Sequence, residues 1–292
     1  MEAAAALLGH VPSREARALS SGKSGTIAVI VPDIGHQGCP ALVKGIYSEL
    51  NAVRYTQLLL ETEGNSRLEA TVLEQVRKST DGVIIAASAL SDNDLRAAAS
   101  RRPVVAVGWD MPGVPSVVAG PAPALYGALA HLARKEHTHV AYARSSGPLG
   151  WDSRTESRAV QDAAAARGLE LTFLGPFLPT VDSGPAAITE VLGTMATVCV
   201  ASSSLLALGM LERCKQMELS VPGRLSLIGC DDSMGATFCS PSLTTLSSPL
   251  GDVGAAAARM LSAILAGSCG SAGTDRPVVV PAVLKLRAST AT

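Results

Sequence analysis

The sequence predicts an α/β protein built from two doubly wound, parallel-sheet lobes joined by crossover segments. A chain of 292 residues has enough material for two lobes of roughly 120–150 residues each. Apolar residues make up 47% of the chain and aromatic residues only 3%, so the cores must consist of Ala, Val, Leu and Ile, as in sheets covered by helices on both faces. Short apolar runs also alternate with helical segments, which is typical of parallel β/α layers.

The first set of elements follows an Ala-rich start, in which Ser13 can cap a short helix ending near Gly22. Its strands are short apolar runs rich in β-branched residues, such as TIAVIV and GVIIA. In order, we expect a strand at Thr26–Val31, a helix at 40–52, a strand at Thr56–Glu61, a helix at Arg67–Lys78 capped by Ser66, a strand at Gly82–Ala86, a helix at 92–100 and a strand at Pro103–Val107.

The same alternation restarts after Val117, with an Ala-rich helical segment that ends at Gly168 and two Val-rich runs close to the C-terminus. Clusters of Gly and Pro near 111–123 and 240–249 mark the crossings between the lobes. We expect helices at 122–135, Ser153–Arg167, 184–193, 203–217 and 250–266, and strands at His139–Ala143, 170–174, Thr197–Val200, Leu225–Gly229, 277–280 and 283–287.

Charge and cysteine usage exclude several classes of protein. The net charge is −1, whereas a free-standing nucleic-acid binder has a marked basic excess. The six cysteines show no C-x-x-C spacing, the start lacks the pattern of a signal peptide, and no apolar run reaches the roughly 20 residues that a membrane helix needs. We therefore expect a cytoplasmic protein with reduced thiols and no contact with a membrane.

Enzyme motifs are absent from the sequence. It contains no G-x-G-x-x-G, Walker P-loop, H-E-x-x-H or G-x-S-x-G segment. His137 and His139 are the only close pair of histidines, and no third metal ligand lies near them in sequence. We expect no catalytic residue, cofactor or metal.

Polar residues follow three of the expected strands, where ligands bind in doubly wound sheets. The three segments are Val31–His36, Gly147–Trp151 and Ile228–Asp232. Asp33 and Asp231 could each accept hydrogen bonds from ligand hydroxyls, although such residues can equally cap a turn or a helix. Trp151 could stack on a ligand, and the following helix carries Arg154 and Arg158 toward the same space.

Four segments, in the same order, resemble the LacI/GalR family of transcriptional repressors. Leu8–Leu19 (LGHVPSREARAL) is similar to the hinge of that family, L-G-Y-x-P-N-x-x-A-R-x-L. Gly229–Asp232 (GCDD) and Pro241–Leu246 (PSLTTL) resemble its G-x-D-D and P-x-L-T-T-V segments, and Val280–Thr290 resembles its L-x-x-R-x-S-T ending. Together these segments span nearly the whole chain.

The resemblance implies a homodimeric regulator whose core is similar to type I periplasmic binding proteins and senses a sugar-like metabolite. It divides the chain into a remnant of the DNA-binding head with the hinge helix (1–24), an N-terminal lobe (25–120 with 248–273) and a C-terminal lobe (121–247 with 274–292). The helix-turn-helix of the family would lie upstream of residue 1. Operator DNA would meet that head and the hinge residues Ser13, Arg14, Ala16, Arg17 and Leu19, with Leu19 as the minor-groove wedge.

The resemblance also assigns roles in the pocket. Arg158 matches, with a shift of one residue, the arginine that faces ligand hydroxyls, and Asp231 matches its carboxylate partner. The full set of expected ligand-binding residues is Asp33, His36, Trp151, Arg154, Arg158, Ser202 and Asp231. The chain departs from the family at Ser202-Ser203, where Asn-Asp is common, and at Gln161, where Gly is common. These departures indicate either a different ligand or a pocket that is no longer tuned to any ligand. A stand-alone sugar-binding protein without DNA binding is the alternative.

Overall fold

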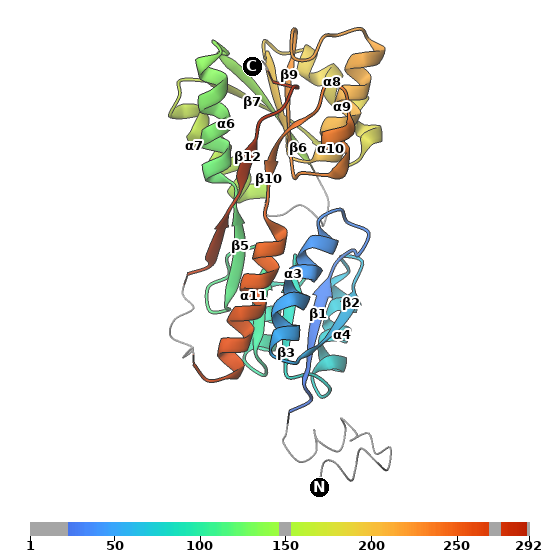
Figure 1. The fold of residues 1–292 in the computed structure, drawn as a ribbon, viewed down its shortest axis with the longest axis vertical. Coiled ribbons are helices and arrows are strands. Elements are labelled where there is room, and N and C mark those ends of the chain that lie inside the picture. Colours follow the sequence, from blue (N-terminus) through green and yellow to red (C-terminus); the bar gives the residue numbers. More distant parts are fainter. Residues whose placement is uncertain (1–22, 146–152, 269–275, 291–292) are drawn as a thin grey trace.

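The computed structural model describes residues 23–145, 153–268 and 276–290. It contains two lobes stacked along the long axis of the molecule, each with its own six-stranded sheet (Figure 1). The two doubly wound lobes predicted from the sequence are confirmed.

The first lobe is an entirely parallel sheet with the strand order β11-β5-β4-β3-β1-β2. Alternate residues of its central strands face opposite sides, because successive side chains of a strand point to opposite faces. Ile27 and Val29 join one core and Ala28 and Ile30 the other. The strands are β1 (Thr26–Val31), β2 (Thr56–Glu61), β3 (Gly82–Ala86), β4 (Val104–Val107), β5 (Ser116–Gly120) and β11 (Val278–Pro281). Helices α3 (Cys39–Ala52) and α11 (Leu250–Leu265) cover one face, and α4 (Ser66–Val76) and α5 (Asp92–Ala99) cover the other.

Helices α3 and α11 lie side by side on the first lobe and approach each other through glycines (Figure 1). A Cβ atom on Gly45 would stand 2.0 Å from the carbonyl oxygen of Gly251, and one on Gly254 would stand 2.3 Å from that of Leu42. Only glycine allows the two backbones to come this close.

The second lobe has the strand order β12-β10-β9-β8-β6-β7, in which only β12 runs antiparallel to its neighbour. Its strands are β6 (His139–Ser145), β7 (Glu170–Phe177), β8 (Val198–Ala201), β9 (Ser226–Cys230), β10 (Thr244–Ser247) and β12 (Val283–Lys285). Helices α6 (Ala122–Arg134) and α7 (Ser153–Ala165) cover one face, whereas α8 (Gly184–Leu192), α9 (Ser204–Gln216) and the short α10 (Met234–Phe238) cover the other (Figure 1). A 3-10 turn, η1 (Val181–Ser183), precedes α8.

Three chain segments cross between the lobes. They lie between β5 and α6, between β10 and α11, and at Ala282 between β11 and β12. The Ala282 amide donates a hydrogen bond to the Gly120 carbonyl at 2.9 Å, which joins two of the crossings. A Cβ atom on Gly120 would lie 2.6 Å from Val279 Cγ1, so a larger residue here would displace the Val279 side chain.

The structure corrects the sequence analysis at several elements. Strands β5 and β10 lie inside stretches expected to be only crossings, and α10 was not expected. The run expected at 277–280 was assigned to the second lobe, but as β11 it pairs with β5 and so completes the first sheet. The cap of α4 is Asn65, whose side chain accepts hydrogen bonds from Arg67 N and Leu68 N, and Ser66 is the first helical residue instead.

Residues 285–289 bind side chains and backbone groups of the second sheet and so stabilise it. Asp232 binds Arg287 Nη2 at 2.7 Å and Lys285 Nζ at 2.5 Å. The Ser289 hydroxyl donates to the Leu227 carbonyl at 2.6 Å and accepts from the Thr244 amide at 2.8 Å. The second Asp of the GCDD segment and the R-x-S-T ending are therefore structural features of the lobe.

The thiols and the two neighbouring histidines of the described part of the chain lie outside any disulfide or metal site. Its five cysteines are free thiols, and no group of His, Cys, Asp and Glu there could hold a metal ion. His137 and His139 each hydrogen-bond a threonine of a neighbouring strand or strand end, at 2.7 Å. None of the described helices is long and apolar enough to cross a membrane.

Candidate functional site

A cavity of about 400 Å³ lies between the lobes, where the ends of their strands meet. The crossing segments form part of its wall, through Gly120, Ser248 and Ala282. Its charged and hydroxyl lining comes mainly from the second lobe. The polar lining residues used below are Asp110, Arg144, Ser145, Glu156, Ser202 and Asp231.

Parallel strands explain why these side chains converge. The carboxyl ends of β6, β8 and β9 lie at one edge of the sheet, because the three strands are neighbours and run in one direction. Ser145 ends β6, Ser202 follows β8 and Asp231 follows β9. The Ser145 amide donates to Ser202 Oγ at 2.6 Å, and Ser202 Oγ donates to Ser145 Oγ at 2.8 Å.

Hydrogen bonds to its backbone fix the position of Asp231, and its carboxylate is available to a ligand in the cavity. Its φ of 67° is a left-handed conformation, which the chain holds in place by two contacts. The Asp231 amide donates to the Leu246 carbonyl at 2.8 Å, and the Ser204 hydroxyl donates to the Asp231 carbonyl. Within the described residues the carboxylate itself makes no hydrogen bond or ion pair, and burial raises the pKa of Asp231 to about 6.

Tyr142 and Glu156 lie at the same place in the cavity. The Tyr142 side chain is only 1% exposed, and within the described residues its hydroxyl has no hydrogen-bond partner of normal geometry. Burial raises the pKa of Tyr142 well above its usual value, and the negative charges of Glu156 and Asp231 raise it further. The pKa of the Cys230 thiol is raised by burial and by the same two carboxylates. Glu156 and Asp231 thus both act on the Tyr142 hydroxyl, and all three residues line the cavity.

Arg144 is the only cationic side chain among the described cavity-lining residues. Its Nη2 donates to the Gly175 carbonyl at 3.2 Å, and its Cζ lies 5.6 Å from the centre of the Phe173 ring. Its Nε is buried without a partner among the described residues. These contacts fix the guanidinium against β7, and the Nε–H group remains available as a donor.

The structure brings together three of the residues expected in the pocket, namely His36, Ser202 and Asp231. Asp33 does not line the cavity, because its carboxylate accepts a hydrogen bond from the Gly35 amide at 2.7 Å and shapes the turn. His36 Nδ1 accepts from the Gly38 amide at 3.2 Å. Burial lowers the pKa of His36, against the opposing charge of Asp33, so the ring is neutral at pH 7.

Helix α7 turns a different residue inward from the one expected. Arg158 is exposed and does not line the cavity, whereas Glu156 and Ser157 do. Each residue of a helix is rotated by about 100° from the one before it, so an alignment shift of one or two positions selects another face. Arg154 belongs to α7, but its side chain, Trp151 and the hinge residues Ser13, Arg14, Ala16, Arg17 and Leu19 lie outside the described residues.

Most lining residues were missed by sequence reasoning, among them Trp109, Tyr142, Arg144 and Glu156. Trp109 follows β4 and could have been found by the strand-end rule that singled out Asp231. Tyr142 and Arg144 lie within β6, and Glu156 lies within α7. For these three, only the packing of the lobes shows which side chains reach the cavity.

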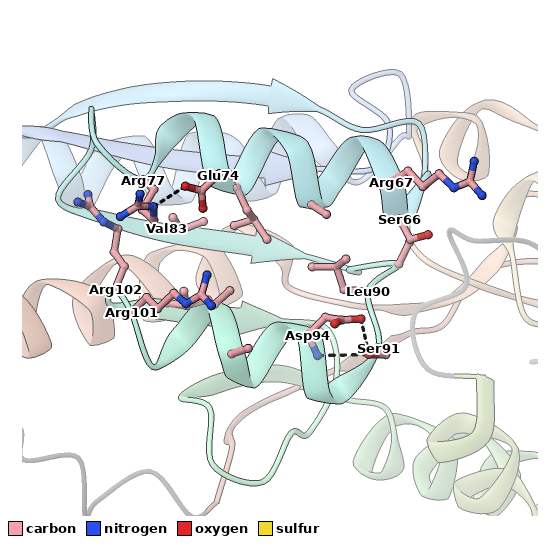
Figure 2. A pocket seen from close by; sticks show the side chains of 16 residues that line it. Ser66, Arg67, Glu74, Arg77, Val83, Leu90, Ser91, Asp94, Arg101 and Arg102 are labelled. Carbon is pink, nitrogen blue, oxygen red and sulfur yellow. Dashed lines mark hydrogen bonds and ion pairs between the residues drawn. The ribbon is translucent and has the colours of Figure 1, made fainter.

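A second depression, of about 720 Å³, lies between α4 and α5 on the outer side of the first lobe (Figure 2). Arg77, Arg101 and Arg102 gather at one end, where Arg77 forms an ion pair with Glu74 at 2.7 Å. Its floor is apolar, with Val83 and Leu90. Although larger, it contains no buried polar atom without a partner, so the interlobe cavity is the better candidate for a ligand site.

Comparisons with known proteins agree with this architecture. The family described as periplasmic binding protein-like domain matches residues 129–290. Catabolite control protein A of Streptococcus mutans is 30% identical over 88% of this chain and 79% of its own length. The HTH-type transcriptional regulator RegA of Clostridium saccharobutylicum is 28% identical over 88% and 80%. A crystal structure of a LacI family transcriptional regulator from Enterococcus faecium with bound ribose has a TM-score of 0.78 at 23% identity, over 91% of this chain and 98% of that one.

Two doubly wound lobes with a shared polar cavity define this chain as a periplasmic-binding-protein-like sensor core. The chain belongs to the LacI/GalR family, and the relatives named above are transcriptional regulators, not enzymes. The resemblance seen in the sequence is confirmed.

Proposed function

We propose that this sensor core binds a sugar, or a related polyol or nucleoside, between its lobes and thereby modulates the binding of operator DNA. One observation carries the proposal. The interlobe cavity contains a carboxylate, Asp231, that makes no hydrogen bond or ion pair within the described residues. A buried polar group without a partner is costly, and a ligand hydroxyl satisfies it. The ribose in the Enterococcus faecium regulator supports a sugar-like ligand.

The crossings give such a ligand a route to the rest of the molecule. A ligand that contacts Asp231 on the second lobe and Trp109 on the first binds the closed arrangement more tightly than the open one. It therefore shifts the population toward closure by its difference in affinity for the two states. The segments that must bend are those at Gly120, Ser248 and Ala282, which border the ligand directly.

Membership of the family suggests two macromolecular partners, operator DNA and a second copy of the chain. Operator DNA is bound through the hinge, residues 13–19, and a helix-turn-helix head, and the protein acts in the cytoplasm as a homodimer. Two large apolar side chains of α10, Met234 and Phe238, are each 80% exposed, which supports a contact with a second copy. The Phe238→Ser variant should sediment as a monomer; an unchanged dimer would exclude this surface.

The cavity assignment is tested by calorimetric titration of the chain with pentoses, hexoses and nucleosides. Replacement Asp231→Asn should weaken any ligand found by about tenfold or more, because it removes a charge-assisted hydrogen bond. Asp33→Asn is the matched control, since Asp33 is a strand-end carboxylate outside the cavity. Equal losses in both variants would place the ligand elsewhere.

The DNA-binding part of the proposal is tested separately. Fluorescence anisotropy with DNA from the region next to the protein's own gene should show binding that changes when the ligand is added. Ligand binding without any DNA binding, in the full-length gene product, would favour a stand-alone sugar-binding protein.

A further inference from the structure

One carboxylate, that of Asp81, binds the residues that lead into β1. Asp81 directly precedes β3, and its Oδ1 accepts hydrogen bonds from the Ser24 amide at 2.7 Å and the Ser24 hydroxyl at 3.0 Å. Its Oδ2 accepts from the Gly25 amide at 2.9 Å. Both oxygens are thus bound by two successive residues, in contacts that are partly buried. Such charge-assisted hydrogen bonds are roughly twice as strong as neutral ones.

Backbone contacts complete this attachment. The Asp81 amide donates to the Thr26 carbonyl, and the Thr56 amide donates to the Gly25 carbonyl, both at 2.8 Å. The φ of Gly25 is 66°, a left-handed conformation that glycine adopts without strain. A Cβ atom here would meet nothing within 4 Å, so the glycine is needed for the backbone conformation rather than for packing. Residues 24–26 are therefore fixed between the starts of β2 and β3.

The attachment lies at the end of the first lobe that is remote from the ligand cavity. Strand β1 begins at Thr26, at the end of the lobe that faces away from the second lobe (Figure 1). After its carboxyl end the chain leads to His36, which lines the cavity. The six residues of β1, at about 3.3 Å each, place roughly 20 Å between the two ends. Asp81 therefore acts on residues 24 and 25 and not on the ligand.

The inference rests on the proposed function, because the DNA-binding hinge, residues 13–19, joins the first lobe through Ser24 and Gly25. We propose that Asp81 is a positioning residue that fixes the hinge to the first lobe, so that the hinge moves with the lobe. Release of Ser24 and Gly25 would widen the range of positions and orientations that the hinge samples. A wider range lowers the effective concentration of the hinge at the operator.

Three variants of the full-length gene product test this role. Asp81→Asn keeps one acceptor oxygen and Asp81→Ala keeps none. Asp92→Asn is the matched control, since Asp92 is an exposed carboxylate of the same lobe, 3.5 Å from Arg96. In fluorescence anisotropy with DNA from the region next to the gene, Asp81→Asn should bind about threefold and Asp81→Ala about tenfold more weakly than the wild-type protein. Asp92→Asn should not bind more weakly.

The sign of the effect separates positioning from charge. Each variant removes one negative charge, which by itself would strengthen binding to DNA phosphates. A loss of affinity in the Asp81 variants is therefore opposite to a charge effect. Circular dichroism at the temperature of the binding assay checks that each variant is folded. Should Asp81→Ala fail to fold, the threefold loss in Asp81→Asn provides the same test.

Hydrogen exchange followed by mass spectrometry measures the attachment directly. The amides of Ser24 and Gly25 should exchange at least about tenfold faster in Asp81→Ala than in the wild-type protein, because both lose their acceptor. Unchanged exchange, unchanged DNA affinity in both Asp81 variants, or an equal loss in Asp92→Asn overturns the role of Asp81 and leaves the proposed function standing. A wild-type protein that binds none of this DNA overturns the DNA-binding part of the proposed function, and the role of Asp81 with it.

Discussion

Replacing Asp232 by asparagine should lower the free energy of unfolding by about 3 kcal/mol, because the change removes the only carboxylate among the described residues that forms an ion pair with Arg287, a mostly buried arginine. Asp232 and Arg287 are only 16% and 17% exposed, and their N···O distance is 2.7 Å. Thr245 Oγ1 donates a further hydrogen bond to the same carboxylate at 2.8 Å. Lys285 is 47% exposed, so its share is at most a few tenths of a kcal/mol.

The matched control is Glu74→Gln. Glu74 pairs with Arg77 at the same distance of 2.7 Å, but the two side chains are 59% and 41% exposed. Solvent screens such a pair, so its loss should cost less than about 0.5 kcal/mol. Burial is thus the main difference between the two ion pairs.

Urea unfolding followed by circular dichroism measures both variants at pH 7. Although burial alone would raise the pKa of Asp232, hydrogen bonds from Lys285, Arg287 and Thr245 together hold it below its usual value. A lowered pKa contributes stability at neutral pH that is lost as the pH falls below about 4, so the deficit of Asp232→Asn should shrink in acid. A loss no larger than that of Glu74→Gln would refute the structural role of this network.

Three other predictions concern ligand binding, packing and thiol chemistry. The pKa of Asp231 is raised to about 6. The affinity for a ligand that needs the ionised carboxylate should therefore fall about tenfold between pH 7.5 and pH 5, as calorimetry at the two pH values can measure. The Asp231→Asn variant should show no such change. Gly254→Ala should destabilise the first lobe by about 2 kcal/mol. Gly251→Ala in the same helix should leave the stability unchanged, because a Cβ on Gly251 meets nothing closer than 3.7 Å. Equal urea midpoints for the two variants would contradict the close helix contact. Burial raises the pKa of Cys199 to about 12, so a thiol reagent should modify the half-buried Cys239 before Cys199. Peptide mass spectrometry measures the two rates, and faster labelling of Cys199 would contradict the packing.

Much of the fold could be predicted because each buried strand is recognisable from its own short run of apolar residues. The runs at Thr26–Val31, Thr56–Glu61 and Gly82–Ala86 form strands with the expected bounds, since buried parallel strands are continuous apolar runs. Strands β5 and β10 were missed because each is short and lies next to Gly and Pro residues that read as a crossing. On one side each pairs with a strand that is remote in the sequence, β5 with β11 and β10 with β12.

The site was less accessible to sequence reasoning, and the physical reason differs between residues. Asp231 and Ser202 stand at strand ends, a position that a doubly wound sheet defines in advance. Glu156 depends on the rotation of α7, and Arg158, two positions later, faces solvent instead. Tyr142 lies within β6 rather than at its end, so the strand-end rule does not select it, although it lines the cavity.

The return of α11 and β11 to the first lobe affects how the protein is made on the ribosome. Val253, Ala257 and Leu261 of α11 are buried against α3 and the sheet, yet they follow the whole second lobe except its last strand in the chain. At synthesis rates of about 5–20 residues per second, roughly 7–30 s separate the end of β5 from the end of α11. During that time the second lobe can fold, while the α3 face of the first stays uncovered. The nascent first lobe therefore presents an apolar surface to chaperones until translation is nearly complete.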